Sequence, residues 1–456
     1  MKRLISPAVT TGYLALCVLL GGSSVAYGGN LLLQLLGIAI LFWALAAGKP
    51  AEITPAGREL VALILLLLLI IAVQLIPLPP GLWTQLPGRD DAAEAYHLVG
   101  QLPPWLPISL APYQTVSSSI WLLPPIAIVI SFLRLGAYRR SWAAWLLIGL
   151  TIVGVLLGTR QVIGGSDWYP YRITNEGAMT GFFANSNHMA TLLLVTAPFA
   201  AALFARAKRE RRTDRNRAGV LIATGLAAIF ILIGLAINNS LAGLALIVPV
   251  AAASLLMIRF DRRQVPGWCW LLVAAAGAAS TTAALIGPLG NDLLEAKPPN
   301  QLITRYSAWP RTLQAAAEFA PFGSGIGTFV NVYPRYEDPA LVDGTYMNHA
   351  HNDYLELALE TGAPGLALLG AFMLWWSRRT IAVWRNSQHA DAFARAATIA
   401  SAAILVHSSV DYPLRMTAIS ALLALCCGLM SVAAPMPSSV ATNRRAFRNV
   451  LHLAND

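Results

Sequence analysis

Apolar runs of about 20 residues recur from one end of this 456-residue chain to the other. Hydrophobic residues make up 56% of the sequence, and charged residues make up only 12%. Because an α-helix needs about 20 apolar residues to cross the hydrocarbon core of a bilayer, each run predicts a transmembrane helix. No polar block long enough for a soluble domain separates the runs. We therefore expect one all-α, polytopic membrane domain over residues 1–456.

The apolar runs predict about twelve transmembrane helices. They cover residues 8–27, 30–47, 59–77, 114–133, 141–159, 181–205, 218–237, 241–258, 267–287, 354–377, 393–411 and 414–434. The first 28 residues also fit a cleavable secretion signal, with a basic start, an apolar middle and small residues near Ser24. We favour an uncleaved first helix, and cleavage would leave the later topology unchanged.

The basic residues predict which side of the membrane each loop faces. If residues 1–3 are cytoplasmic and the helices alternate, the clusters of basic residues fall in cytoplasmic loops, as the positive-inside rule requires. These clusters lie at residues 134–140, 206–212, 259–263, 378–385 and 444–448. The net charge of +10 is then a signal for topology and for anionic lipids, and it gives no reason to expect nucleic-acid binding. Both termini, including a tail at 435–456, are expected in the cytoplasm.

Three segments on the opposite, outer side are long enough to carry a site: residues 78–113, 160–180 and 288–353. The third is predicted to be a large, partly helical loop between the ninth and tenth helices. It contains Gly323-Ser324-Gly325-Ile326-Gly327. Alternating glycines of this kind either wrap backbone N–H groups round an anion or make a tight turn that docks the loop. The sequence favours the turn and leaves both open.

A dense polar cluster at residues 348–356 runs directly into the apolar segment 357–376. If the helix begins near His349, then Asn348, Asn352 and Glu356 share one of its faces. Burying so many polar groups at a bilayer edge costs several kcal/mol unless they face one another or a wet cavity. Histidine can accept and release a proton near neutral pH. The cluster therefore predicts proton-transfer chemistry, for which we favour His351.

The spacing of His351-Asn352, nine residues, Gly362, two residues and Gly365 resembles the signature of the O-antigen ligase and O-antigen polymerase superfamily. Three further segments agree with this resemblance: residues 172–187, 305–329 and 407–415. Together the matching segments cover roughly residues 170–435.

The resemblance implies an inverting glycosyltransferase that uses neither a metal ion nor another cofactor. Such an enzyme takes a glycan from an undecaprenyl pyrophosphate carrier and joins it to a sugar hydroxyl at the periplasmic face of the bacterial inner membrane. His351 would be the base for the acceptor hydroxyl. Arg172 and Arg305 would bind the pyrophosphate. The loop 288–353 would cover the site.

One departure from the family concerns an arginine. The family often carries a Ser-Arg pair at the outer start of the eighth helix, where this chain has Ser240-Leu241. Either Arg311 or Arg415 replaces that arginine, or fewer charges hold the phosphates.

Other polar residues near these segments are expected to bind sugar or to support the site. They are Asn185, Asn187, Asn348, His349, Asn352, Asp353 and Tyr354. Asp411 either orients a histidine or caps a helix, and we favour the cap.

The expected partners are the carrier-linked glycan donor, membrane lipids and an acceptor. The acceptor distinguishes the possible reactions: an O-antigen ligase uses the lipid A core, and a polymerase uses another carrier-linked repeat. The motif spacing favours the ligase. A protein O-oligosaccharyltransferase is a less favoured alternative. So is a transporter of lipid-linked glycans, because the charges lie at helix ends and no internal repeat is evident.

Overall fold

The computed structural model describes residues 2–25, 27–47, 51–136, 140–209, 214–260, 263–286, 299–337, 339, 346–385 and 391–433. The predicted tail 435–456 lies outside these residues. Most of the described chain is helical, as expected for an all-α membrane protein. The elements are α1 (Lys2–Leu20), α2 (Gly28–Ala46), α3 (Pro55–Gln74), β1 (Pro77–Leu78), α4 (Pro80–Trp83), α5 (Asp90–Leu98), β2 (Leu106–Pro107), α6 (Pro112–Ile120), α7 (Leu123–Leu135), α8 (Arg140–Gly164), η1 (Ser166–Trp168), α9 (Ser186–Arg209), α10 (Asp214–Asn238), α11 (Leu241–Arg259), α12 (Gly267–Ile286), α14 (Pro299–Glu318), α15 (Phe329–Val332), η2 (Tyr333–Tyr336), α16 (Asp353–Arg385), α17 (Ala392–His407), η4 (Pro413–Arg415) and α18 (Thr417–Val432).

Nine helical segments within the described residues are long and apolar enough to cross a membrane. They are Gly28–Ala46, Pro55–Gln74, Pro112–Leu135, Ser141–Gly164, Ser186–Arg209, Asn216–Asn238, Leu241–Arg259, Gly267–Leu285 and Asp353–Arg385. Three shorter apolar helices cover Ile5–Leu20, Ala392–His407 and Thr417–Val432. The chain is a multi-pass membrane protein, and the expected total of about twelve crossings stays a prediction.

Two hydrogen bonds each join chain segments that the sequence predicts on one side of the membrane, and the alternation itself stays a prediction. On the face that we call outer, the Ala418 N–H donates to Gly21 O at 3.0 Å. On the face that we call inner, the Thr54 hydroxyl donates to Ser431 O at 2.7 Å.

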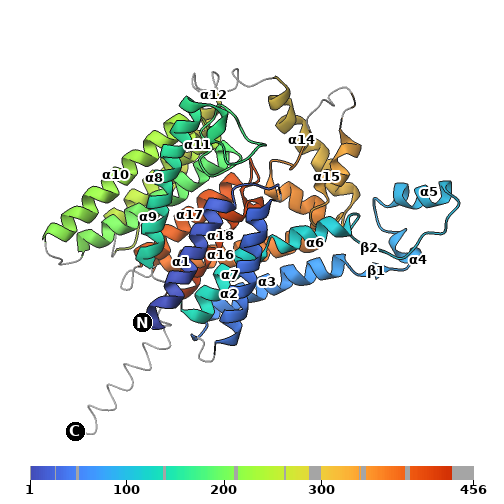
Figure 1. Cartoon of the computed structure of the whole chain (residues 1–456), viewed down its shortest axis with the longest axis horizontal. Coiled ribbons are helices and arrows are strands. Elements are labelled where there is room, and N and C mark those ends of the chain that lie inside the picture. Colours follow the sequence, from blue (N-terminus) through green and yellow to red (C-terminus); the bar gives the residue numbers. More distant parts are fainter. Residues whose placement is uncertain are drawn as a thin grey trace, which may run out of the picture.

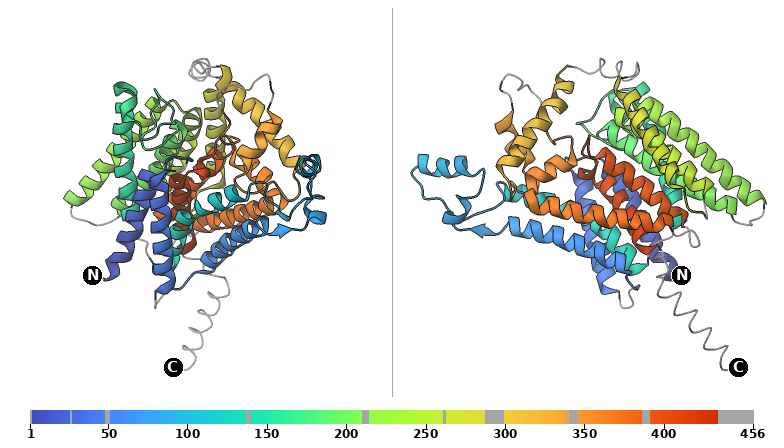
Figure 2. Two further views of the ribbon diagram at one scale, coloured as in Figure 1. Left: turned by 45° about the vertical axis from the view of Figure 1, so that its right-hand side comes forward. Right: turned by 180° about the vertical axis from the view of Figure 1, so that it is seen from behind.

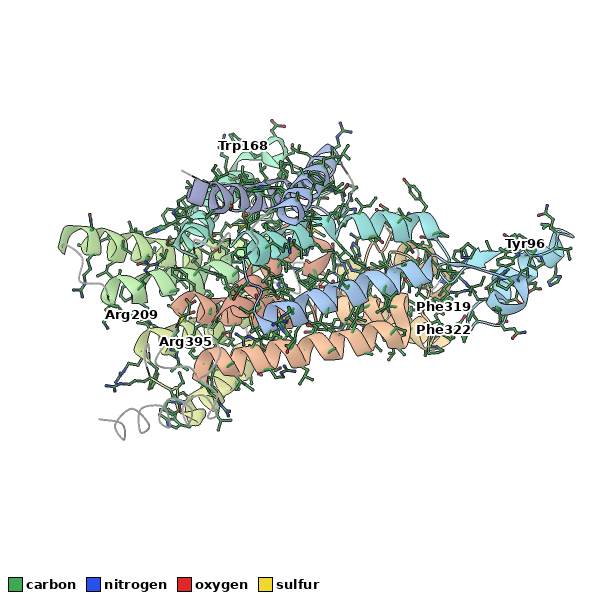
Figure 3. The ribbon with its side chains drawn as sticks, turned by 90° about the horizontal axis from the view of Figure 1, so that it is seen from below. Tyr96, Trp168, Arg209, Phe319, Phe322 and Arg395 are labelled. Atoms are coloured by element: carbon green, nitrogen blue, oxygen red, sulfur yellow. The ribbon has the colours of Figure 1, made fainter. Side chains whose placement is uncertain are left out.

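Figure 3 shows Arg209 and Arg395 toward one end of the molecule and Phe319 and Phe322 toward the other.

The helix α9 lies at the centre of the bundle. It packs against α10, α11 and α17, and 83% of its apolar window is buried. Other helices, and not lipid, therefore cover most of its surface. In Figure 1 the helices α10, α11 and α12 lie on one side of the molecule, and α1, α16, α17 and α18 lie nearer its middle. The outer end of α9 is thus enclosed by the helices that carry the polar segments.

An arm formed by β1, α4, α5 and β2 projects beyond α3 (Figure 2). Its two short strands pair antiparallel, with Pro77 opposite Pro107. Arg89 anchors the arm: its side chain is buried, donates to the carbonyls of Ile108 and Gly323, and lies over the Phe319 ring. Burial, together with Arg335, lowers the pKa of Arg89 to about 10. This outer arginine therefore holds the fold together.

A break at Gly362 divides α16 into a polar first part and an apolar second part. Gly362 has φ 57° and ψ −145°, angles that other residues rarely adopt. A Cβ atom there would lie 2.2 Å from the Pro321 carbonyl oxygen. The glycine of the motif thus lets the outer loop approach the helix just beyond the polar cluster.

Candidate functional site

The polar cluster begins as a turn that precedes the helix. Asn352 caps α16, because its Oδ1 accepts from the N–H groups of Tyr354 at 3.0 Å and Leu355 at 3.1 Å. His351 has φ +50°, so it lies outside the helix. The condition that the helix begins near His349 is not met, so Asn348, Asn352 and Glu356 do not share a helix face, and α16 begins at Asp353, next to the predicted start at residue 354.

The turn is fastened to the end of α17. The Asn352 amide donates to Ser409 O at 2.9 Å, and the Tyr354 hydroxyl donates to Leu405 O at 2.6 Å. These contacts fix the positions of the two histidines that precede α16.

His351 forms a pair with Asp411, which lies 60 residues later. The distance between His351 Nδ1 and Asp411 Oδ1 is 3.2 Å, and Asp411 is fully buried. The second oxygen, Oδ2, accepts from the Asn187 amide at 2.5 Å. The Ser240 hydroxyl in turn donates to Asn187 Oδ1 at 2.8 Å. Because Asp411 binds a histidine, the prediction that it caps a helix is wrong.

His349 forms a second pair, with Glu356 in its own segment. Its Nδ1 lies 2.9 Å from Glu356 Oε1, and Glu356 Oε2 accepts from the Ala350 N–H at 2.9 Å. Glu356 also lies 3.5 Å from Nη2 of Arg415. The two histidines, two residues apart, therefore belong to different networks.

Arg415 joins three buried carboxylates. Its Nη1 lies 2.9 Å from Glu360 Oε2, and its Nε lies 3.8 Å from Asp353 Oδ1, in addition to its contact with Glu356. Burial alone would lower the pKa of Arg415, but the three carboxylates outweigh burial and raise it above its ordinary value. The guanidinium is therefore positively charged.

Tyr412 lies between the two histidine pairs. Its ring centroid is 4.4 Å from that of His349 and 4.9 Å from that of His351. The Asn348 amide donates to its hydroxyl at 3.3 Å. Burial, together with Asp411, raises the pKa of Tyr412 to about 12, so the phenol stays protonated. One aromatic ring thus separates the two histidines.

A cavity of about 500 Å³ opens beside the second pair. The polar part of its lining includes Asn348, His349, Asp353, Glu356, Glu360 and Arg415. Residues of α6 and α3 also line the cavity. His351 lies outside this lining, with 19% of its side chain exposed.

The glycine segment 323–327 docks against the start of α16, as the turn interpretation predicts. Each of its five N–H groups donates to a protein oxygen; the acceptors are Phe319 O, Leu359 O, Glu360 O, Gln74 Oε1 and Glu360 Oε1. The segment therefore has no N–H groups left for an anion.

The predicted pyrophosphate arginines lie in different surroundings. Arg172 is exposed on the loop between α8 and α9. Arg311 donates to Tyr336 O at 2.5 Å. Arg305 lies on α14, and its side chain falls outside the described part of the structure. Arg415 is held by carboxylates. Asn185 orders the start of α9, where its Oδ1 accepts from the Asn187 N–H at 2.9 Å.

Sequence reasoning missed Glu356 and Glu360 as site residues. Their spacing of four along a helix, at its polar end, was a usable signal, because such residues share a face. Tyr412 was also missed, and nothing local to it reveals its two histidine neighbours.

Residues 226–370 match the family model described as O-antigen ligase. This match supports the resemblance of residues 226–370 to the O-antigen ligase superfamily. No curated protein matches the chain. The matched range contains His349, His351, the glycine segment and Gly362, whereas Arg172, Asp411 and Arg415 lie outside it. The match supports a membrane glycosyltransferase of the ligase or polymerase type.

Proposed function

We propose that this protein is an O-antigen ligase of the bacterial inner membrane. It transfers a glycan from undecaprenyl pyrophosphate to a sugar hydroxyl of the lipid A core, at the periplasmic face and without a metal ion. The observation that carries the proposal is the buried Asp411 at 3.2 Å from His351 Nδ1, within a chain that matches the O-antigen ligase family model.

His351 is the base in this reaction. When its Nδ1–H donates to Asp411, the free lone pair is on Nε2, which accepts the proton of the acceptor hydroxyl. The acceptor oxygen then bonds to the anomeric carbon, and the bond from that carbon to the pyrophosphate oxygen breaks with its electron pair. Attack from the face opposite the leaving group inverts the anomeric centre.

Arg172 and Arg305 stabilise the departing pyrophosphate. Guanidinium groups bind phosphate oxygens bidentately and keep their charge, so they can neutralise the charge that grows on the leaving group. Arg172 is exposed, and no ion pair to it is found within the described residues. Arg311 and Arg415 already bind protein oxygens, which favours the other two arginines.

The proposal is tested with purified protein, carrier-linked glycan and rough lipopolysaccharide from a strain that lacks this protein. We expect transfer in the presence of a chelator, and a need for Mg²⁺ or Mn²⁺ would contradict the metal-free reaction. We expect Arg172→Ala and Arg305→Ala to raise the KM for donor about 10-fold or more.

The matched control is Arg378→Ala. Arg378 pairs with Glu59 on the inner face, its side chain is 59% exposed, and such a surface pair contributes little to stability. Equal losses in all three variants would indicate misfolding and would remove the arginine assignment.

A deletion strain separates the ligase from the polymerase. Without the ligase, long glycans accumulate on the carrier. Accumulation of single carrier-linked repeats would show instead that the protein is a polymerase. Mass spectrometry of extracted lipids measures the difference.

A further inference from the structure

The cavity beside His349 has an excess of negative charge at its polar end. Asp353, Glu356 and Glu360 line it and are buried. Arg415 lines it as well and is shared among all three carboxylates. With all three carboxylates ionised and His349 protonated, the formal charge of these five residues is −1.

This charge disfavours a phosphate and favours hydroxyl groups. Phosphoryl oxygens are anionic and accept hydrogen bonds, so a pyrophosphate here would be repelled by buried carboxylates. A sugar hydroxyl donates a hydrogen bond without adding charge. In the described part of the chain, Asp353 Oδ1 and Glu360 Oε2 accept no hydrogen bond of good geometry, and each is held by its ion pair with Arg415. These two oxygens are themselves buried, so they set the negative charge at this end of the cavity.

The remaining walls also suit a sugar. The first turns of α6 contribute the hydroxyl and amide side chains of Gln114, Ser117 and Ser118, and Trp121 and Leu67 contribute apolar surface. Sugar rings have both hydroxyl edges and apolar C–H faces. A cavity of about 500 Å³ also falls within the range of small-molecule sites, about 300–1,000 Å³.

We propose that this cavity binds the neutral sugar of the acceptor, and that the donor pyrophosphate binds elsewhere. The inference rests on the proposed function, because it names the site of one of the two substrates. His349 forms part of the cavity wall and contacts the Tyr412 ring, which in turn contacts His351. A sugar in the cavity therefore lies beside the His349–Glu356 pair. Arg415 holds the carboxylates in place as a positioning residue.

The test is a steady-state assay in which donor and acceptor are varied separately. Ser117→Trp places a large side chain in the cavity, and we expect the KM for acceptor to rise about 10-fold or more. The KM for donor should stay within about 2-fold of the unmodified protein. The matched control is Val116→Trp, the neighbouring position on α6, which is 45% exposed and lies outside the lining. A rise in the donor KM for Ser117→Trp, or equal effects at the two positions, overturns the proposal.

A second measurement does not depend on turnover. A photoreactive benzophenone amino acid at position 117 should crosslink to rough lipopolysaccharide and not to carrier-linked glycan supplied alone. Capture of the donor, or of neither substrate, overturns the proposal. If the unmodified protein transfers no glycan, the proposed function fails. If it does transfer glycan but position 117 captures donor, the proposed sugar site is contradicted and the proposed function stands.

Discussion

The two histidine–carboxylate pairs have the same local geometry but different connections. In each pair the histidine Nδ1 faces a buried carboxylate, at 3.2 Å for His351 and Asp411 and at 2.9 Å for His349 and Glu356. The first pair joins residues 60 positions apart, and the second joins residues 7 positions apart. The geometry of the second pair therefore depends on one turn and on the start of α16. The geometry of the first pair depends on the packing of separate helices.

The different connections determine which structural changes should affect each histidine. Asp411 is hydrogen-bonded to Asn187, which is hydrogen-bonded to Ser240, so the position of Asp411 depends on the outer ends of α9 and α11. Glu356 forms an ion pair with Arg415 and lines the cavity. Changes at the ends of α9 and α11 should therefore reach His351 and leave His349 unaffected.

The largest expected effect separates the two histidines directly. His351→Ala removes the base and should lower the rate of glycan transfer by about 10³-fold, with the donor KM little changed. His349→Ala should mainly raise the acceptor KM, by about 10-fold. Single-turnover transfer and separate substrate titrations measure these effects. The control is His97→Ala on the exposed arm. A larger rate loss for His349→Ala than for His351→Ala would indicate that His349 is the base.

Asp411→Asn should give the next largest effect, a loss of about 10²-fold in kcat. The new amide can donate to His351 Nδ1, which would place the imidazole proton on Nε2 and block proton acceptance there. Thermal unfolding is measured beside the rate. A full kcat with a lowered melting temperature would show that Asp411 only supports the fold.

The membrane helices were predictable from the sequence because the bilayer fixes how long an apolar run must be. Packing decided where some of them end. The first helix was expected at 8–27 but ends at Leu20. Beyond it, Gly22 lies so close to the segment that precedes α9 that an added Cβ would approach Phe182 O to 2.1 Å. Such an end is set by tertiary contacts.

The site was predictable only in part, for a similar reason. His351 and Gly362 stand in one local motif, so spacing alone could indicate them. Asp411 and Arg415 are linked to that motif only through the fold, and short-range reasoning made Asp411 a helix cap. The glycine segment was interpreted correctly as a turn, but its acceptors on Gln74 and Glu360 could not be known.

Asn187→Leu should have an intermediate effect, about a 10-fold loss in kcat. Leucine has nearly the same size but cannot donate to Asp411 or accept from Ser240. The carboxylate would lose one partner and hold His351 less firmly. The pH profile of kcat distinguishes this positioning effect from a loss of folded protein, because only the former shifts the pH at which the base is protonated. An unchanged profile with less folded protein would contradict it.

The smallest expected effect comes from the far end of the chain of hydrogen bonds. Ser240→Ala removes one hydrogen bond to Asn187, worth about 1 kcal/mol, and should lower kcat roughly 5-fold. It also removes the cap of α11, where Ser240 accepts from the Gly243 N–H, so the melting temperature should fall too. Ser240→Thr keeps the hydroxyl and should restore both properties. Ser254→Ala is the matched control on the same helix, because that hydroxyl donates to Val250 O within α11. If both alanine variants slow transfer equally, the rate follows the stability of α11, and the hydrogen bonds from Ser240 to His351 do not act as one unit.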